Sequence, residues 1–281
     1  MSNILVADAG SSKTNWSLLM EESDIPLRVS TSGINPAHQN PLAISEIILE
    51  VKNSLPQCQI NEIYFFGAGC ASRYLKTIVE KCLAEIFDAD RIVVESDLLG
   101  AAIALFEDGK GVAAILGTGS NTGYYSEGKI VRQIPSLGYI LGDEGAGVSL
   151  GKALLNGIFK QTLPKNIIEE FHHEYSLSVE DLIHKVYKEP KPAAFIASFT
   201  PFIMNHMKCE EIKVLAEERF KEFFKKNVLP YGYNLLTNIG MVGSIAYHFQ
   251  EQVRHAAAYF DLNLSNILKE PMPSLEKYFR S

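Results

Sequence analysis

The chain has 281 residues, of which 47% are hydrophobic and 21% are charged, and its formal net charge is −7. This length and apolar content are sufficient for two domains with a core each. The acidic balance excludes a general binder of nucleic acids or of anionic membranes, because such proteins present a basic face.

The sequence also indicates the compartment. No apolar run approaches the roughly 18 residues of a membrane span, and the first residues run into a strand-like segment without a basic region and cleavage site. We therefore expect a soluble, cytoplasmic protein with no membrane partner. The four cysteines form no Cys-x-x-Cys pair, which favours structural thiols over a zinc site.

Three short strands are expected first, at 3–8, 15–20 and 27–31. The first two enclose the loop Ala9-Gly-Ser-Ser-Lys-Thr14. Glycines and hydroxyls allow backbone N–H groups to approach an anion, so this loop is a candidate phosphate site, with Lys13 and Thr14 near the terminal phosphates. It is not a Walker A loop, because Gly-x-x-x-x-Gly-Lys-[Ser/Thr] is absent.

Asp8 precedes this loop at the end of the first strand. Its carboxylate is a candidate to hold Mg²⁺ directly or through water, since a hard dication prefers oxygen ligands. A strand-ending aspartate that caps a turn is the alternative interpretation.

Strands and amphipathic helices then alternate, which predicts an α/β sheet led by an antiparallel meander. Helices are expected at 41–55, 72–87 and 97–106, and strands at 60–67 and 91–95. Asp97 follows the last of these strands. It is a candidate general base at the carboxyl end of a strand, and equally a first-turn or N-cap acid.

The strand, loop and strand pattern recurs in the second half. Strands at 111–115, 122–125 and 130–134 accompany the loop Leu116-Gly-Thr-Gly-Ser-Asn121, in which Thr118 and Ser120 can add hydroxyl donors. Ordinary hairpins have the same composition. Two such loops, one from each half, could bind one polyphosphate in a cleft between domains.

Two later segments carry candidate ligand groups. In Gly142-Asp-Glu-Gly145 an acid could bind sugar hydroxyls through charge-assisted hydrogen bonds. Gly243-Ser244 ends a strand expected at 237–242 and opens a helix, which suits the sugar or base of a nucleotide. The segment 164–230 is expected to be helical, with an apolar face along 211–228, and prolines 271 and 273 introduce a short terminal helix.

Together these segments resemble the BadF/BadG/BcrA/BcrD-type ATPase family, which includes N-acetylglucosamine kinases, within the actin, hexokinase and Hsp70 superfamily. Five segments carry the resemblance: Asp8 to Thr14, Ser96 to Ala102, Gly117 to Asn121, Gly138 to Gly145 and Val242 to Ser244. It implies two ribonuclease H-like domains, 1–110 and 111–264, around an interdomain nucleotide cleft. The helical insertion would be 164–230, and a C-terminal helix at about 265–281 would return to the first domain.

The resemblance also implies ATP with Mg²⁺, and transfer of the γ-phosphoryl group to the 6-hydroxyl of an amino sugar. Asp97 would be the catalytic base and Asp8 the metal site. The ATP-binding residues would be Gly10, Ser11, Ser12, Lys13, Thr14, Gly117, Thr118, Gly119, Gly243 and Ser244. The sugar-binding residues would be Asn35, Asp97, Ser120, Asn121, Ser136, Leu137, Gly138 and Asp143. A homodimer is expected by analogy.

Leu137 departs from the family, whose N-acetylglucosamine kinases tend to carry a tryptophan there, so a related hexosamine or muramyl-type sugar is an alternative substrate. A radical-dehydratase activator ATPase is a second alternative, with Cys70 as its one candidate cluster ligand. A sugar or nucleotide sensor without turnover is a third. ROK kinases are disfavoured, because their zinc-binding cysteine cluster is absent.

Overall fold

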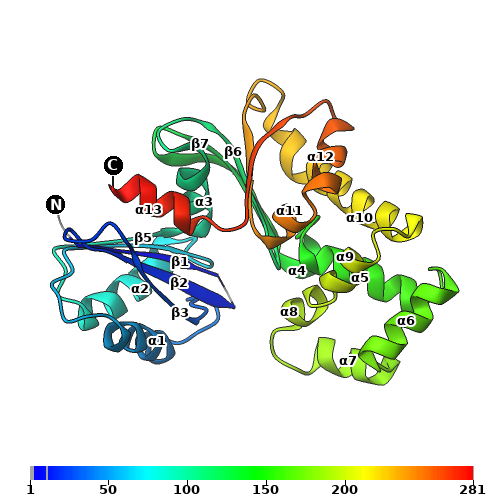
Figure 1. Cartoon of the computed structure of the whole chain (residues 1–281), viewed down its shortest axis with the longest axis horizontal. Helices are drawn as coiled ribbons and strands as arrows, with labels where there is room; N and C mark the ends of the chain where they lie inside the picture. The colour runs from blue at the N-terminus through cyan, green and yellow to red at the C-terminus, as the bar shows by residue number, and fades with distance from the viewer. Residues whose placement is uncertain (1–2, 11, 281) are drawn as a thin grey trace. The chain divides into compact units, whose positions relative to one another are not determined.

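A computed structural model describes residues 3–10 and 12–280 (Figure 1). The chain divides into two compact units. Unit 1 comprises Met1–Gly109, Glu127–Ile130 and Glu270–Ser281, and unit 2 comprises Lys110–Ser126 and Val131–Lys269. Each unit has a five-stranded sheet, which confirms the two-domain α/β prediction.

Unit 1 is a three-layer α/β/α sandwich with the strand order β3-β2-β1-β4-β5. In Figure 1, α1 and α2 cover one face of the sheet, and α3 and α13 cover the other. Its elements are β1 (Ile4–Ala9), β2 (Lys13–Leu19), β3 (Leu27–Ser32), α1 (Pro41–Ser54), β4 (Glu62–Gly67), α2 (Arg73–Ile86), β5 (Arg91–Ser96), α3 (Asp97–Phe106) and α13 (Met272–Arg280).

The core of unit 1 lies between the sheet and the pair α1 and α2. Trp16 on β2 is fully buried, 5.8 Å from the ring of Phe65 on β4, and its indole N–H donates to the Thr31 hydroxyl at 3.1 Å. Both α1 and α2 begin after an N-cap residue. The side chain of Asn40 accepts a backbone N–H in the first turn of α1, and that of Ser72 does the same in α2. The sequence predicted both helices within two residues of their observed ends.

Unit 2 repeats the three-strand meander, and its sheet has the order β10-β9-β6-β7-β8. The sheet elements and the helices next to them are β6 (Gly111–Leu116), β7 (Ser120–Ser126), β8 (Lys129–Ile134), α4 (Gly138–Leu141), α5 (Gly147–Phe159), β9 (Ile239–Val242), α11 (Ser244–His248), α12 (Gln250–Ala258) and β10 (Leu264–Leu268). The repeat predicted from the sequence is confirmed.

The segment between α5 and β9 is helical, as predicted. It comprises α6 (Lys165–Tyr175), α7 (Val179–Tyr187), α8 (Pro192–Ala197), α9 (Thr200–Asn205), α10 (Glu210–Phe223), a π-helical turn η1 (Phe224–Val228) and a 3₁₀ turn η2 (Leu229–Tyr231). The described residues include no helix with the length and apolar character needed to cross a membrane.

Two expectations need correction, and one short helix was missed. A strand, β10, occupies Leu264–Leu268, so the C-terminal helix begins only at Met272 rather than near residue 265. The helix expected after Gly243 is interrupted at Phe249, which separates α11 from α12. The short helix α4 was not predicted, because its three apolar side chains are too few to show a helical period.

Candidate active site

The acidic candidates of unit 1 lie where its parallel strands end. The sheet register pairs Ala9 with Gly67, and Gly67 with Ser96, so the carboxyl ends of β1, β4 and β5 share one edge. Asp8 is the penultimate residue of β1, and Asp97 begins α3 directly after β5. Open α/β sheets bind ligands at this edge.

Asp8 has an unusual environment for a carboxylate. Burial, together with the smaller effect of the negative charges of Asp97 and Glu270, raises its pKa to about 7. Its side chain has no hydrogen bond to another described residue. A cation would offset both the lost hydration and the neighbouring charges, so this position fits Mg²⁺.

The described residues contain no group of three or more His, Cys, Asp or Glu side chains that could hold a metal ion by themselves. Mg²⁺ commonly keeps several waters and binds substrate phosphates together with one or two carboxylates. One direct protein ligand, Asp8, is compatible with that coordination.

Asp97 is held rigidly at the start of α3. The hydroxyl of Ser96 is the N-cap and accepts the Leu99 N–H at 3.3 Å, while the Asp97 carboxylate accepts the Leu98 N–H at 2.8 Å. Asp97 is therefore a first-turn acid and not the N-cap. Burial raises its pKa to about 6, although the backbone hydrogen bonds act in the opposite direction.

Asn35 is fixed at the turn after β3. Its side-chain oxygen accepts the Ala37 N–H at 3.0 Å and lies so close to Gly69 that a Cβ atom there would be 2.0 Å away. Thr14 is fully buried, and its hydroxyl accepts the Ile34 N–H at 3.1 Å. Thr14 thus holds the segment between β3 and Asn35, and its side chain is not open to a ligand.

The β1–β2 loop is a tight turn in which the Gly10 N–H donates to the Lys13 carbonyl at 2.9 Å. Ser12 and Lys13 are exposed. Ser11 lies outside the described residues.

In unit 2 the corresponding loop is Gly117–Gly119, between β6 and β7. The first turn of α5 supports it, because Gly147 N–H donates to the Gly117 carbonyl at 2.8 Å and Val148 N–H donates to the Thr118 carbonyl at 3.0 Å. With the carbonyls occupied, the Thr118 and Gly119 N–H groups have no acceptor among the described residues. Such unpaired donors suit an anion.

Asp143 lies against the same loop. Its carboxylate accepts the Ser120 N–H at 2.9 Å, and a Cβ atom on Gly119 would be 2.9 Å from both carboxylate oxygens. The segment before Asp143 folds back on it, since Asp143 N–H donates to the Ser136 carbonyl at 3.3 Å. Burial raises the pKa of Asp143, while the positive charge of Lys152 opposes this.

Leu137 and Gly138 both have left-handed backbone, with φ of 60° and 69°, in the turn that brings Ser136 to Asp143. Leu137 is exposed. Of the predicted sugar-binding residues of this segment, Ser136 is thus held next to Asp143, which contacts the Gly117–Gly119 loop.

Ser120 carries an unsatisfied polar group. The residue is buried, and its hydroxyl has no hydrogen-bond partner among the described residues. A buried hydroxyl without a partner costs free energy unless a ligand or water supplies one. Asn121 is already engaged, because its side-chain oxygen accepts Gln133 Nε2 at 2.9 Å and its own neighbour's N–H, that of Thr122, at 3.0 Å.

Gly243 also reaches this loop. Its φ is 128°, and a Cβ atom there would be 2.2 Å from the Leu116 carbonyl oxygen and 3.3 Å from the Gly117 nitrogen. Only glycine allows β9 to end so close to β6. Ser244, the next residue, is exposed.

The predicted residues thus form two sets. Unit 1 contains Asp8, Asp97 and Asn35. Unit 2 contains Gly117–Gly119, Ser120, Ser136, Asp143 and Gly243.

Two residues next to these sites were not predicted from the sequence. Gly69 could have been found from Gly67-Ala-Gly-Cys70 at the end of β4, whereas Glu270 has no local motif and approaches Asp8 only through the fold.

Cys70, the candidate cluster ligand of the activator alternative, is buried, and burial raises its pKa to about 12. Iron–sulfur clusters require thiolate ligands, and a thiol with such a high pKa is a poor source of one. All four cysteines are free.

No protein-family model matches the chain. A crystal structure of a candidate N-acetylglucosamine kinase from Porphyromonas gingivalis is 36% identical, with a TM-score of 0.89 and 98% of each chain covered. A candidate N-acetylglucosamine kinase from Chromobacterium violaceum has a TM-score of 0.79 over 99% of each chain, and at 13% identity it shows the fold alone.

Among curated proteins, the N-acetylmuramic acid/N-acetylglucosamine kinase of Clostridium acetobutylicum is 28% identical over 241 residues, which are 80% of this chain and 78% of that protein. The two-domain fold, the duplicated loops and the full-length similarity to the Porphyromonas structure all indicate the same family. The chain therefore belongs to the N-acetylglucosamine kinase-like family of actin-like ATPases.

Proposed function

We propose that the chain is a sugar kinase that transfers the γ-phosphoryl group of ATP to the 6-hydroxyl of N-acetylglucosamine. The observation that carries this proposal is Asp97, a rigid and partly buried carboxylate whose pKa is raised to about 6. A base with this pKa is ionised at neutral pH and can still accept the proton of an attacking hydroxyl. The names of the Porphyromonas and Clostridium relatives support the amino-sugar substrate.

The proposed roles follow the two sets of residues. The ATP phosphates would contact Gly10 to Lys13, including Ser11, in unit 1, and the free N–H groups of Thr118 and Gly119 in unit 2. Gly243 and Ser244 would lie near adenosine. Asp8 would hold Mg²⁺, which when bound neutralises developing phosphate charge. Thr14 is kept as a supporting residue.

Asp143 would bind a sugar hydroxyl through the carboxylate oxygen that Ser120 N–H leaves free, and the Ser120 hydroxyl would gain its missing partner from the sugar. Asn35, Asn121 and the segment Ser136–Gly138 would complete the sugar site. Positioning of the two reactants, together with charge stabilisation, would supply most of the rate enhancement.

The test is ADP release by the full chain with a panel of hexoses, hexosamines, N-acylated hexosamines and a muramyl sugar. We expect N-acetylglucosamine to give the highest kcat/KM, and Asp97→Asn to lower kcat by roughly 10²- to 10⁴-fold with ATP binding retained. Because the base works only when ionised, kcat should fall as the pH decreases through about 6.

Asp88→Asn, at an exposed position of the same unit, is the matched control and should leave kcat unchanged. Wild-type turnover in Asp97→Asn would remove Asp97 from the base role. ATP and sugar binding without ADP release from any sugar would instead indicate the sensor alternative.

A further inference from the structure

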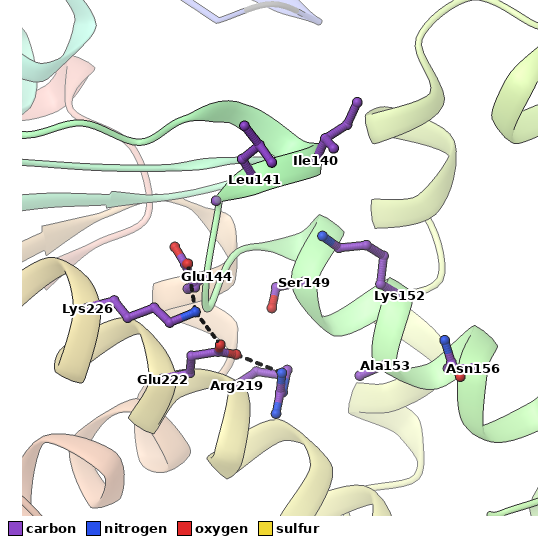
Figure 2. Close-up of a pocket in the computed structure, with 11 residues that line it drawn as sticks. Ile140, Leu141, Glu144, Ser149, Lys152, Ala153, Asn156, Arg219, Glu222 and Lys226 are labelled. Carbon is purple, nitrogen blue, oxygen red and sulfur yellow. Dashed lines mark hydrogen bonds and ion pairs between the residues drawn. The ribbon is translucent and has the colours of Figure 1, made fainter.

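Unit 2 contains a cavity of about 390 Å³ that none of the proposed catalytic roles uses (Figure 2). Its walls are α5, α10 with η1, and the segment from Ile140 to Glu144. Asp143 does not line it, and its carboxylate is turned to the Ser120 N–H. The volume is in the range of small-molecule sites and is sufficient for a hexose-sized ligand.

A hydroxyl that opens into the cavity supports a ligand there. Ser149, in the first turn of α5, lines the cavity and is only 7% exposed. Its hydroxyl makes no hydrogen bond to any other described residue. Figure 2 shows this hydroxyl directed toward the side of α5 that faces Arg219 and Glu222. A hydroxyl in this position is available to hydrogen-bond to a molecule in the cavity.

The charges around the cavity leave a positive surplus. The cavity wall contains two acidic residues, Glu144 and Glu222, and Lys226 forms an ion pair with each, at 3.3 Å and 2.7 Å. Arg219 uses one of its nitrogens to pair with Glu222 at 2.7 Å. Lys152 makes no ion pair with a described residue, and its ammonium donates to the Tyr139 carbonyl at 2.8 Å. The cavity therefore offers an unpaired ammonium and the free nitrogens of a guanidinium to an anion.

We propose that this cavity is a second, non-catalytic site for a phosphate monoester of a hexosamine, with Ser149, Lys152 and Arg219 binding the phosphate. The remaining wall suits a sugar ring, because it combines hydrogen-bonding side chains such as Asn156 with the apolar carbons of Ile140 and Ala153. The phosphate chemistry is shared with free inorganic phosphate. The assignment of the sugar rests on the proposed function.

Occupancy of this site would act on the catalytic residues through Lys152. Its ammonium must leave the Tyr139 carbonyl to reach the anion, which removes a bond between α5 and α4. The positive charge that favours ionised Asp143 would be neutralised at the same time. The bound ester would therefore weaken sugar binding, which is feedback by the kinase's class of product.

The test is calorimetric titration of the full chain, already saturated with Mg²⁺, a non-hydrolysable ATP analogue and N-acetylglucosamine. Inorganic phosphate and N-acetylglucosamine 6-phosphate are the two titrants. We expect both to bind, with the sugar ester tighter. Lys152→Gln should weaken binding by at least about tenfold, and Ser149→Ala by about threefold. Lys165→Gln, at an exposed lysine of unit 2, is the matched control and should bind as wild type does.

Three results would overturn the proposal. The first is that neither titrant binds to the saturated protein, which would assign the anion to the ATP loops. The second is an affinity of Lys152→Gln equal to that of the wild type, and the third is binding of inorganic phosphate without binding of the sugar ester. A rise in the KM for sugar at saturating ester, absent in Lys152→Gln, would support the regulatory role. The binding readout needs no turnover, so an inactive chain that binds the ester would refute the proposed function and leave the cavity site standing.

Discussion

Asp8 and Asp97 show how one physical effect can prepare two carboxylates for different roles. In both, loss of hydration is the largest cause that raises the pKa, to about 7 for Asp8 and about 6 for Asp97. Asp97 also accepts a backbone hydrogen bond that favours its ionised form, whereas Asp8 faces the additional negative charges of Asp97 and Glu270. Asp8 is therefore the carboxylate that gains most from a cation.

This difference leads to a prediction about protons. At pH 7 a carboxyl with a pKa of about 7 is half protonated, and a cation bound to it must displace that proton. We expect binding of Mg²⁺·ATP at pH 7 to release roughly half a proton more from the wild type than from Asp8→Asn. Calorimetry in buffers of different ionisation enthalpy measures the difference, and the contribution of the nucleotide cancels between the two proteins.

Asp88→Asn should release as many protons as the wild type does. Equal release by wild type and Asp8→Asn would show that the cation does not contact Asp8.

At the scale of elements, the Gly117–Gly119 loop depends on its neighbours more than on its own composition. Its glycines predicted a phosphate loop, but the donors that hold its carbonyls come from α5, and Gly243 packs against its start from the end of β9. The three segments are far apart in sequence. The sequence could therefore name the members of the site but not the hydrogen bonds between them.

Two glycines at this loop provide a matched pair of variants. A methyl group on Gly243 would lie 2.2 Å from a backbone oxygen at a φ of 128°, whereas one on Gly117 has no atom within 4 Å. We expect Gly243→Ala to lower the free energy of unfolding by at least about 2 kcal/mol and Gly117→Ala to change it by less than about 0.5 kcal/mol. Urea denaturation of both variants gives the comparison, and equal stability would mean that β9 and β6 can separate without cost.

Elements with a clear hydrophobic period were predicted close to their observed ends, and the misses have physical reasons. β10 is short, and only the first of its residues is buried, so neither alternation nor an apolar run marks it. Along α10 the predicted apolar face is confirmed, since Phe220, Phe223 and Phe224 are fully buried at the i, i+3 and i+4 spacing of a regular helix. That period does not predict the π-helical turn η1, which follows at Phe224–Val228.

At the scale of the whole molecule, the last segment of the chain belongs to the first unit. α13 packs on β1, β2 and α3. Glu276 on this helix is buried and accepts Arg28 Nε at 2.7 Å and the Ser17 hydroxyl at 2.6 Å, and it also pairs with Arg28 Nη2 at 2.5 Å. Contacts between residues so distant in sequence leave no trace in local patterns, which is why the sequence could suggest the return of the helix only by resemblance.

The ion pair of Glu276 makes the stability of unit 1 depend on pH. Its hydrogen bonds to Arg28 and Ser17 lower the pKa of Glu276, although burial acts the other way. The ionised form is thus stabilised in the folded state, and this stabilisation is complete above the unfolded pKa of about 4.3 and lost as the pH falls through the lower folded value. Because Arg28 is half exposed, we expect Glu276→Gln to cost only about 1–2 kcal/mol at pH 7.

Urea denaturation of wild type and Glu276→Gln between pH 3 and pH 8 tests this account, with the exposed Glu46→Gln as control. The difference between wild type and Glu276→Gln should be constant above about pH 5.5 and should shrink below about pH 4.3, while the control follows the wild type throughout. A difference that persists at pH 3 would mean that the side chain acts by packing rather than by charge. In that case α13 would be held on unit 1 by its apolar contacts alone, chiefly those of the fully buried Leu275.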